Sequence, residues 1–212
     1  MADDANDTQH LVERLRAGDR QALTDLFQRH RERLRRMVEL RMDARLQGRV
    51  DASDVLQDAF LDAAAHLDWY LKGSDLPPFL WLRLVVAERL AIAHRRHLGT
   101  KMRDVGQEVS LYRSPLPQAS SAALASMLLG RLTSPSNAAI RAEQVLQVQE
   151  ALNALDPLDR EVIALRQFEE LSRAETAQVL GITEEAGAKR YLRALRRLKA
   201  VLEARPGGLE GM

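Results

Sequence analysis

The chain has 212 residues, of which 46% are hydrophobic, only 4% are aromatic and none is cysteine. This length suits one ordinary domain or two small ones, and the lack of cysteine excludes a disulfide scaffold and thiolate-bound zinc. The net charge of +1 favours no partner by itself, but acidic and basic residues are segregated along the chain, which indicates partners of both signs.

The N-terminal stretch "MADDANDTQH" is polar and acidic, unlike a secretory signal. The longest apolar run, "LRLVVAERLAIA", is interrupted by Arg83, Glu88 and Arg89. We therefore expect no membrane insertion and a cytoplasmic protein. Hydrophobic periodicity predicts helices almost throughout and no convincing strand, so the expected fold class is all-α.

The first predicted block spans residues 9–104 and holds three or four helices, after a disordered N-terminus at 1–8. The stretch "HLVERLRAGDRQALTDLFQRHRERLRRMVELRM" contains two of them and breaks near Gly18. An acidic helix follows, and the loop "KGSDLPP" must end it because proline cannot continue a helix. The stretch "FLWLRLVVAERLAIAHRRHL" then predicts a long helix that ends at Gly99.

The stretch "VDASDVLQDAF" begins an unusual acidic strip. Asp54, Asp58 and Asp62 fall within an arc of about 80° on a helix. Like charges four residues apart destabilise a helix by roughly 0.2–0.5 kcal/mol per pair. The strip is either a solvated face, a metal site of a hydrolase with histidines such as His66 and His94, or a docking face. No enzyme motif accompanies it, whereas a basic partner protein explains why the repulsion is tolerated.

Residues 105–137 contain three prolines and many serines, and we expect a flexible linker there. Within it, "AALASMLLGRL" predicts a short amphipathic helix, which either packs on its own domain or docks on another protein. A second block of four helices spans 138–203, followed by a flexible tail at 204–212. In this block, Asp156 before Pro157 predicts a helix N-terminus.

The second block contains the elements of a helix-turn-helix. The stretch "SRAE" from Ser172 predicts a capping box, Gly181 ends that short helix, and Thr183 caps a longer basic one. Such a second helix enters the major groove of DNA, although a basic helix can also be a solvated surface that binds nothing. Gly187 costs about 1 kcal/mol relative to alanine in this helix and leaves open whether another backbone approaches closely.

Taken together, these stretches resemble the bacterial sigma factors of the extracytoplasmic-function (ECF) class. "DASDVLQDAF" resembles the region-two signature of the family, and "LSRAETAQVLGITEEAGAKRYLRALRRLK" resembles its region-four helix-turn-helix. The resemblance covers about residues 9–203. It implies two small helical domains, region 2 and region 4, joined by a flexible linker. It also implies a factor that directs transcription initiation at promoters, with no enzymatic activity and no cofactor.

The resemblance further implies partners and site residues. The partners are core RNA polymerase, promoter DNA and an anti-sigma protein, and no catalytic or metal-binding residue is implied. The residues implied to dock on the coiled coil of the largest polymerase subunit are Asp54, Gln57 and Asp58. Those implied at the minus-ten element are Lys72, Gly73, Ser74, Arg83, Arg89, Arg95 and Arg96. Those implied at the minus-thirty-five element are Lys189, Arg190, Arg193, Arg196 and Arg197.

Two points stay open at the level of sequence. The family often has asparagine at the position of Arg89 and aspartate at that of Ala93, so an unusual minus-ten preference and weaker promoter melting are both compatible with the chain. The alternative function is a helix-turn-helix transcriptional regulator that does not act as a polymerase subunit. Such a regulator would not need the first block in this form.

Overall fold

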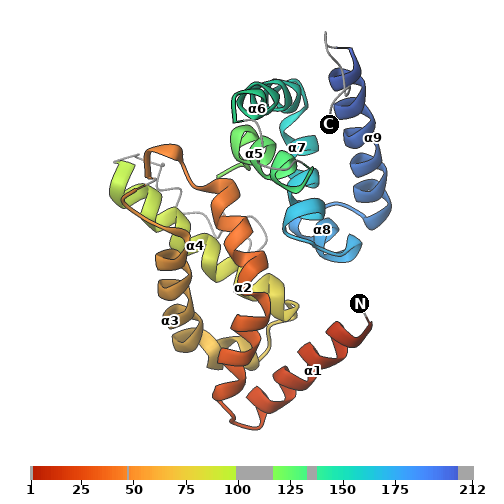
Figure 1. The fold of residues 1–212 in the computed structure, drawn as a ribbon. Helices are drawn as coiled ribbons and strands as arrows, with labels where there is room; N and C mark the ends of the chain where they lie inside the picture. Colours follow the sequence, from red (N-terminus) through yellow and green to blue (C-terminus); the bar gives the residue numbers. More distant parts are fainter. Residues whose placement is uncertain (1, 47, 99–116, 133–137, 205–212) are drawn as a thin grey trace. The chain divides into compact units, whose positions relative to one another are not determined.

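A computed structural model describes residues 2–46, 48–98, 117–132 and 138–204. Within these ranges all regular structure is helical, as predicted. The chain divides into two units, one of residues 1–38 and 42–116 and the other of residues 39–41 and 117–212, and each is described by itself (Figure 1). Among the described helices, none has the length and apolarity needed to cross a bilayer.

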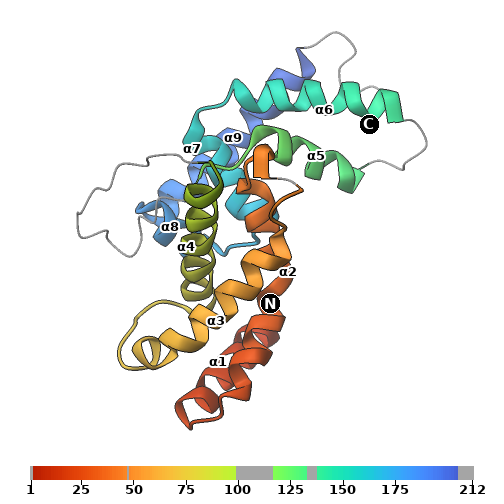
Figure 2. The same ribbon diagram turned by 90° about the vertical axis from the view of Figure 1, so that its left-hand side faces the viewer.

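The described residues of the first unit form four helices and one short 3-10 turn, although residues 39–41 at the end of its second helix are grouped with the other unit. Their bounds are α1 Ala2–Arg16, α2 Gln21–Arg41, η1 Ala44–Leu46, α3 Ala52–Leu71 and α4 Pro78–Leu98. Aromatic pairs join α2 to both later helices: the ring centroids of Phe27 and Phe60 lie 5.3 Å apart, and those of His30 and Phe79 lie 5.2 Å apart. α3 packs along α4 (Figure 2). The core therefore lies where α2, α3 and α4 meet.

Local sequence signals set the helix ends in this unit. Gly18 adopts a left-handed φ of 91° in the turn between α1 and α2, a conformation that glycine reaches without a Cβ penalty. The Asp51 side chain caps α3 by accepting the Ser53 N–H, and the Asp54 carboxylate in turn accepts the Asp51 N–H at 3.3 Å. This reciprocal capping box satisfies two amides that the first helical turn leaves free.

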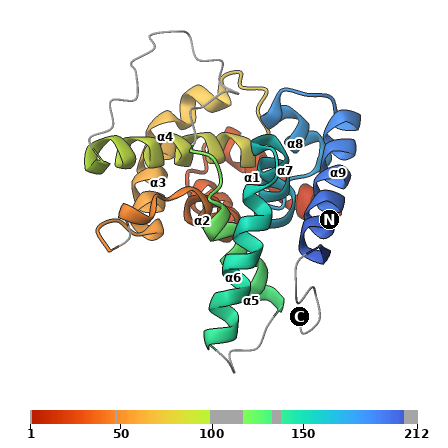
Figure 3. The same ribbon diagram turned by 90° about the horizontal axis from the view of Figure 1, so that it is seen from above.

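Where the structure describes the second unit, it contains five α-helices, with α5 lying alongside α6 (Figure 3). Their bounds are α5 Ser121–Leu132, α6 Ala138–Asn153, α7 Pro157–Ile163, α8 Arg173–Leu180 and α9 Glu184–Glu203, with a π-helical segment η2 at Ala164–Phe168. One hydrophobic cluster includes Leu124 and Leu129 of α5, Leu152 of α6, Phe168 of η2 and Leu198 of α9. Burial of these side chains holds the unit together, because each apolar face covers another.

The helix predicted for "AALASMLLGRL" is α5. Of the two alternatives it packs on its own unit, because Leu124, Ala125 and Leu129 are fully covered there, so this part of the expected linker belongs to the second unit. The structure differs from the sequence-based expectations in two other places. Residues 2–8, expected to be disordered, belong to helix α1. The π-helical segment was not predicted. The expected linker residues 105–116 and 133–137, and the tail after Ala204, lie outside the described residues.

Candidate protein-docking and nucleic-acid interfaces

The exposed face of α3 carries the three residues implied in polymerase docking. Asp54, Gln57 and Asp58 are all exposed, while Leu56 and Ala59 on the opposite face are buried in the core. This division follows from the 3.6-residue helical period. Asp54 has a second duty in the capping box of α3. Asp58 makes no such contact with the described residues, so its carboxylate faces water directly.

The last acid of the strip, Asp62, has a partner within the first unit. Its carboxylate forms a two-point ion pair with the guanidinium of Arg89 on α4. The Arg89 contact also holds the pKa of Asp62 below its usual value. The pair joins α3 to α4, and the side chains are only 29% and 27% exposed. Arg89, implied at the minus-ten element, is therefore engaged inside the protein.

Figure 2 shows the course of the loop between α3 and α4. A buried aromatic stack, formed by one residue on each side of the loop, contacts it. The rings of Tyr70 and Trp81 stack with centroids 4.2 Å apart. The Tyr70 hydroxyl donates to the Leu76 carbonyl at 3.1 Å, and burial raises the pKa of Tyr70 to about 12. Above this stack, Lys72 and Gly73 are exposed. Lys72 and Gly73 are therefore exposed at the start of a loop whose later part is held by the Tyr70 contact.

Other residues implied at the minus-ten element fall into two groups. Ser74 is partly exposed, and its hydroxyl accepts the Leu76 N–H at 3.3 Å within the loop. Arg95 and Arg96 are exposed in the last turn of α4. In contrast, Arg83 is 6% exposed and belongs to the interior of the unit. Only the first group is accessible to a ligand in this conformation.

Helices α8 and α9 form the helix-turn-helix, and their ends follow the predicted signals. Ser172 and Glu175 form the capping box of α8, with the Ser172 hydroxyl accepting the Glu175 N–H at 3.1 Å. Gly181 ends α8 in the left-handed region at φ 65°. The Thr183 side chain then accepts the Ala186 N–H at 3.2 Å and starts α9. All three predicted signals are confirmed.

The four arginines of α9 divide into two sets. Arg190 and Arg197 both donate to the carboxylate of Asp159 on α7, at 2.8 and 2.7 Å, and the Asp159 side chain is only 3% exposed. Arg193 and Arg196 are exposed and form no ion pair with any described residue. The first set anchors α9 to α7, whereas the second set is free to meet a ligand.

Lys189, the remaining basic residue implied at the minus-thirty-five element, is exposed and pairs with Glu185 one helical turn earlier. Both side chains are well solvated, and pairs of this kind contribute little to stability. An incoming anion can therefore displace Glu185 at small cost.

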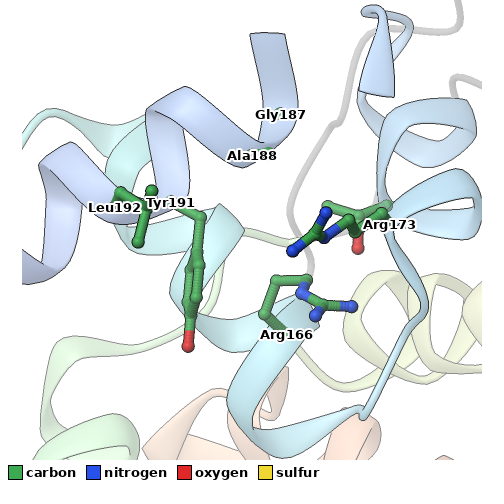
Figure 4. A pocket seen from close by; sticks show the side chains of 7 residues that line it. Arg166, Arg173, Gly187, Ala188, Tyr191 and Leu192 are labelled. Atoms are coloured by element: carbon green, nitrogen blue, oxygen red, sulfur yellow. The ribbon is translucent and has the colours of Figure 1, made fainter. Parts of the chain in front are cut away.

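A small cavity of about 110 Å³ lies between α8, α9 and the π-helical segment. Gly187, Tyr191 and Leu192 of α9 line it, and Arg166 and Arg173 converge on the same space (Figure 4). Arg166 also lies 5.8 Å from the Tyr191 ring centroid. These two arginines and Asp159 were not predicted as functional residues, because their contact with α9 depends on the tertiary fold rather than on any motif.

The structure also places the histidines considered as metal ligands. His66 Nδ1 lies 2.9 Å from the carbonyl oxygen of Asp62, one turn earlier in its own helix. His94 is 7% exposed, and its Nε2 accepts the Asp43 N–H at 3.4 Å. Across the described ranges, no three acidic or histidine side chains gather in a way that could hold a metal ion.

Comparison with known proteins places the chain in a family. Residues 146–198 match the family model described as sigma-70, region 4. The chain is 30% identical over 183 residues to the ECF RNA polymerase sigma factor SigD of Mycobacterium tuberculosis, which covers 86% of this chain and 78% of that protein. It is 28% identical over 198 residues to the RNA polymerase sigma factor NccH of Alcaligenes xylosoxydans xylosoxydans, covering 92% and 94%.

A solved structure shares the fold. CnrH, in complex with the cytosolic domain of CnrY, matches with a TM-score of 0.52 and 24% identity over 92% of this chain and 97% of that one. At this identity the likeness concerns the fold alone, while the match to SigD is long enough to decide the family. The chain belongs to the ECF RNA polymerase sigma factors.

Proposed function

We propose that this sigma factor binds core RNA polymerase through α3 and directs initiation at promoters that the loop after α3 and the helix α9 contact. The observation that carries the proposal is the exposed acidic face of α3 in a chain that also carries outward-facing arginines on a helix-turn-helix. The proposal includes no covalent chemistry, because differences in binding energy suffice to select promoters. It places the protein in the cytoplasm, where it would meet polymerase and DNA.

The docking step rests on Asp54, Gln57 and Asp58, which share the exposed face of α3. Facing a cationic polymerase surface, the two carboxylates would speed association, because complementary charge steers diffusional encounter. Asp58 is the most informative residue, since it has no part in the capping box that engages Asp54.

For promoter contact, we propose a narrower set than the resemblance implies. Exposure supports Lys72, Gly73, Arg95 and Arg96 in the first unit, together with the partly exposed Ser74. Arg83 and Arg89 are instead proposed to act inside the protein: Arg83 is buried in the core and Arg89 joins α3 to α4.

At the upstream element, we propose that Arg193 and Arg196 make the direct contacts, with Lys189 beside them. All three are exposed on α9. Arginine reads guanine edges bidentately or binds phosphate, and each phosphate contact adds about one unit to the salt slope of binding. Arg190 and Arg197 are proposed to hold α9 in place through Asp159.

The docking proposal is tested by measuring the affinity of core polymerase for the wild type and for the Asp54→Asn/Asp58→Asn double variant. Asparagine at position 54 keeps an oxygen that can accept the capping hydrogen bond, so the comparison isolates charge. We expect weaker binding and a smaller salt dependence for the variant. Equal affinities at all salt concentrations would remove the proposed role of the acidic face.

Run-off transcription separates the proposal from the alternative regulator. Core polymerase is mixed with the protein and a library of promoter fragments, and transcripts are sequenced. A sigma factor makes core enzyme initiate at defined sites, whereas a regulator cannot. Transcripts that require a different sigma factor in the mixture would support the regulator instead.

We also propose a protein inhibitor of the anti-sigma class as a further partner. The solved structure of CnrH, which shares the fold, contains the cytosolic domain of CnrY. An inhibitor that covers the face of Asp54 and Asp58 would compete with polymerase for the same carboxylates. Competition binding with core enzyme tests this, because an inhibitor that leaves core affinity unchanged does not act at α3.

A further inference from the structure

Large apolar side chains gather on the same exposed face of α3 as the proposed docking residues. Leu61 is 61% exposed and Trp69 is 50% exposed, two of the four large hydrophobic residues that are exposed in the described part of the chain. Ala65, midway between them, is exposed as well. Exposed tryptophan is uncommon unless its surface is used, because leaving that apolar area in water is unfavourable.

These residues form one continuous row with Gln57. Positions 57, 61, 65 and 69 are successive steps of four, which form a ridge along a helix surface. We call Gln57, Leu61, Ala65 and Trp69 the 57–69 ridge. Asp54 and Asp58 lie on the neighbouring row, so the polar docking residues and the apolar ones are parts of one surface.

We propose that the apolar members of the 57–69 ridge, Leu61, Ala65 and Trp69, are the apolar half of the polymerase-docking surface, with Trp69 as its main anchor. This inference rests on the proposed function and extends it from three polar residues to two apolar contacts. The predicted partner surface is helical, with basic side chains opposite Asp54 and Asp58. Beyond them it carries a shallow apolar groove that receives Leu61 and Trp69.

The charges around Trp69 favour a protein over nucleic acid as the occupant. A tryptophan beside a lysine, here Lys72, is also a feature of sites that stack unpaired bases. However, Asp54 and Asp58 extend along the same helix and are exposed, and so is Asp68 next to Trp69, although the Asp68 carboxylate also lies 3.5 Å from the exposed Arg20 guanidinium. These carboxylates would repel a phosphate backbone, whereas they attract a basic protein surface.

The two halves of the surface are predicted to act on different kinetic steps. Exposed charges mainly set the association rate and its salt dependence, whereas buried anchors mainly set the dissociation rate. Removal of a central aromatic anchor typically weakens binding by about tenfold or more. The ridge residues should therefore change the lifetime of the complex and leave its salt dependence unchanged.

The test measures association and dissociation rates of full-length Leu61→Ala and Trp69→Ala proteins with core polymerase over a series of salt concentrations. We expect Trp69→Ala to dissociate about tenfold faster or more, Leu61→Ala to show a smaller change in the same direction, and both to keep the wild-type salt slope. Leu146→Ala is the matched control, since Leu146 is a 59% exposed leucine in the second unit. Melting curves verify that each variant is folded.

Hydroxyl-radical footprinting of the holoenzyme supplies an independent readout, with Trp81 as an internal standard because it is only 1% exposed. We expect core polymerase to protect Trp69 from oxidation. Protection of Trp69 by promoter single strands without core enzyme would make it a base-stacking residue and overturn the inference. Protection that grows with protein concentration alone would overturn it too, in favour of a second copy of the chain.

The two proposals fail in different ways. If Leu61→Ala and Trp69→Ala bind core polymerase as the wild type does while Asp58→Asn binds more weakly, the ridge is not part of the interface and the acidic docking face remains. If Asp58→Asn also binds as the wild type does, the docking role of α3 is refuted together with the ridge.

Discussion

The ion pairs beneath α9 lead to a quantitative prediction about the second unit. Asp159 on α7 accepts from both Arg190 and Arg197, which lie about two turns apart on α9. The Asp159→Asn substitution keeps the shape of the side chain and removes its charge. It leaves one amide oxygen to face two guanidinium groups, and its NH2 group cannot accept from either.

The magnitude follows from the burial of each partner. A hydrogen bond to a charged group contributes roughly 1.5–3 kcal/mol. The Asp159 side chain is 3% exposed, but those of Arg190 and Arg197 are 32% and 59% exposed and can turn toward water. We therefore expect a loss of about 2 kcal/mol in the free energy of unfolding, below the sum of two such bonds. For a unit of this size that lowers its melting temperature by about 8–16 °C.

Differential scanning calorimetry of the full chain measures this change, and DNA binding separates anchoring from contact. Arg190→Ala should lower both the melting temperature and promoter affinity. Arg193→Ala, at an exposed site on the same helix, should lower affinity and the salt slope while changing stability by less than about 0.5 kcal/mol. A shift smaller than about 2 °C for Asp159→Asn would refute the anchoring role of the ion pairs.

Two further predictions concern stability. Gly187→Ala should stabilise α9 by up to about 1 kcal/mol, since the added Cβ would meet only Ile182 Cδ1 at 3.7 Å. Gly181→Ala should instead lower the free energy of unfolding by about 1 kcal/mol, because the φ of Gly181 is +65°. Urea unfolding measures both changes. Burial lowers the pKa of His94 from 6.5, so the unfolded chain binds its proton first and the first unit should lose stability as pH falls below 6.5. Urea titrations should show a flatter pH profile for His94→Gln than for the wild type.

Local features of the fold were predictable from the sequence, because the interacting residues lie within one turn of each other. The caps at Asp51, Ser172 and Thr183 and the left-handed end at Gly181 are each decided by a few neighbouring residues. The opposed faces of α3 likewise follow from helical periodicity. Such signals fix where helices start, stop and turn their apolar side.

The use of individual arginines was not predictable, because their partners are distant in sequence. Arg190 pairs with a residue 31 positions away, and Arg89 with one 27 positions away. In the sequence, both are members of basic runs and look like Arg193. Arg190 forms its ion pair only because α7 packs against α9, and Arg89 forms its ion pair only because α3 packs against α4. The resemblance assigns roles to positions, but it does not report that choice.

The burial of Gly187 was also outside the reach of the sequence. A glycine in a helix suggests that another backbone lies near, yet an added Cβ here would make only an ordinary contact with Ile182. The residue borders the cavity of Arg166 and Arg173 instead. Tertiary packing, not helix propensity, determines whether such a position is tight.

In the loop after α3, the residues that fix the backbone position differ from the residues that are exposed at the tip. The Tyr70 hydroxyl donates a hydrogen bond to the Leu76 carbonyl, and the Tyr70 ring stacks on Trp81. The position of the loop is therefore set by residues of α3 and α4. Its tip residues, Lys72, Gly73 and Asp75, take no part in that attachment. Under the proposed function, in which this loop contacts promoter DNA, exchanging these tip residues on an unaltered stem is expected to change promoter preference.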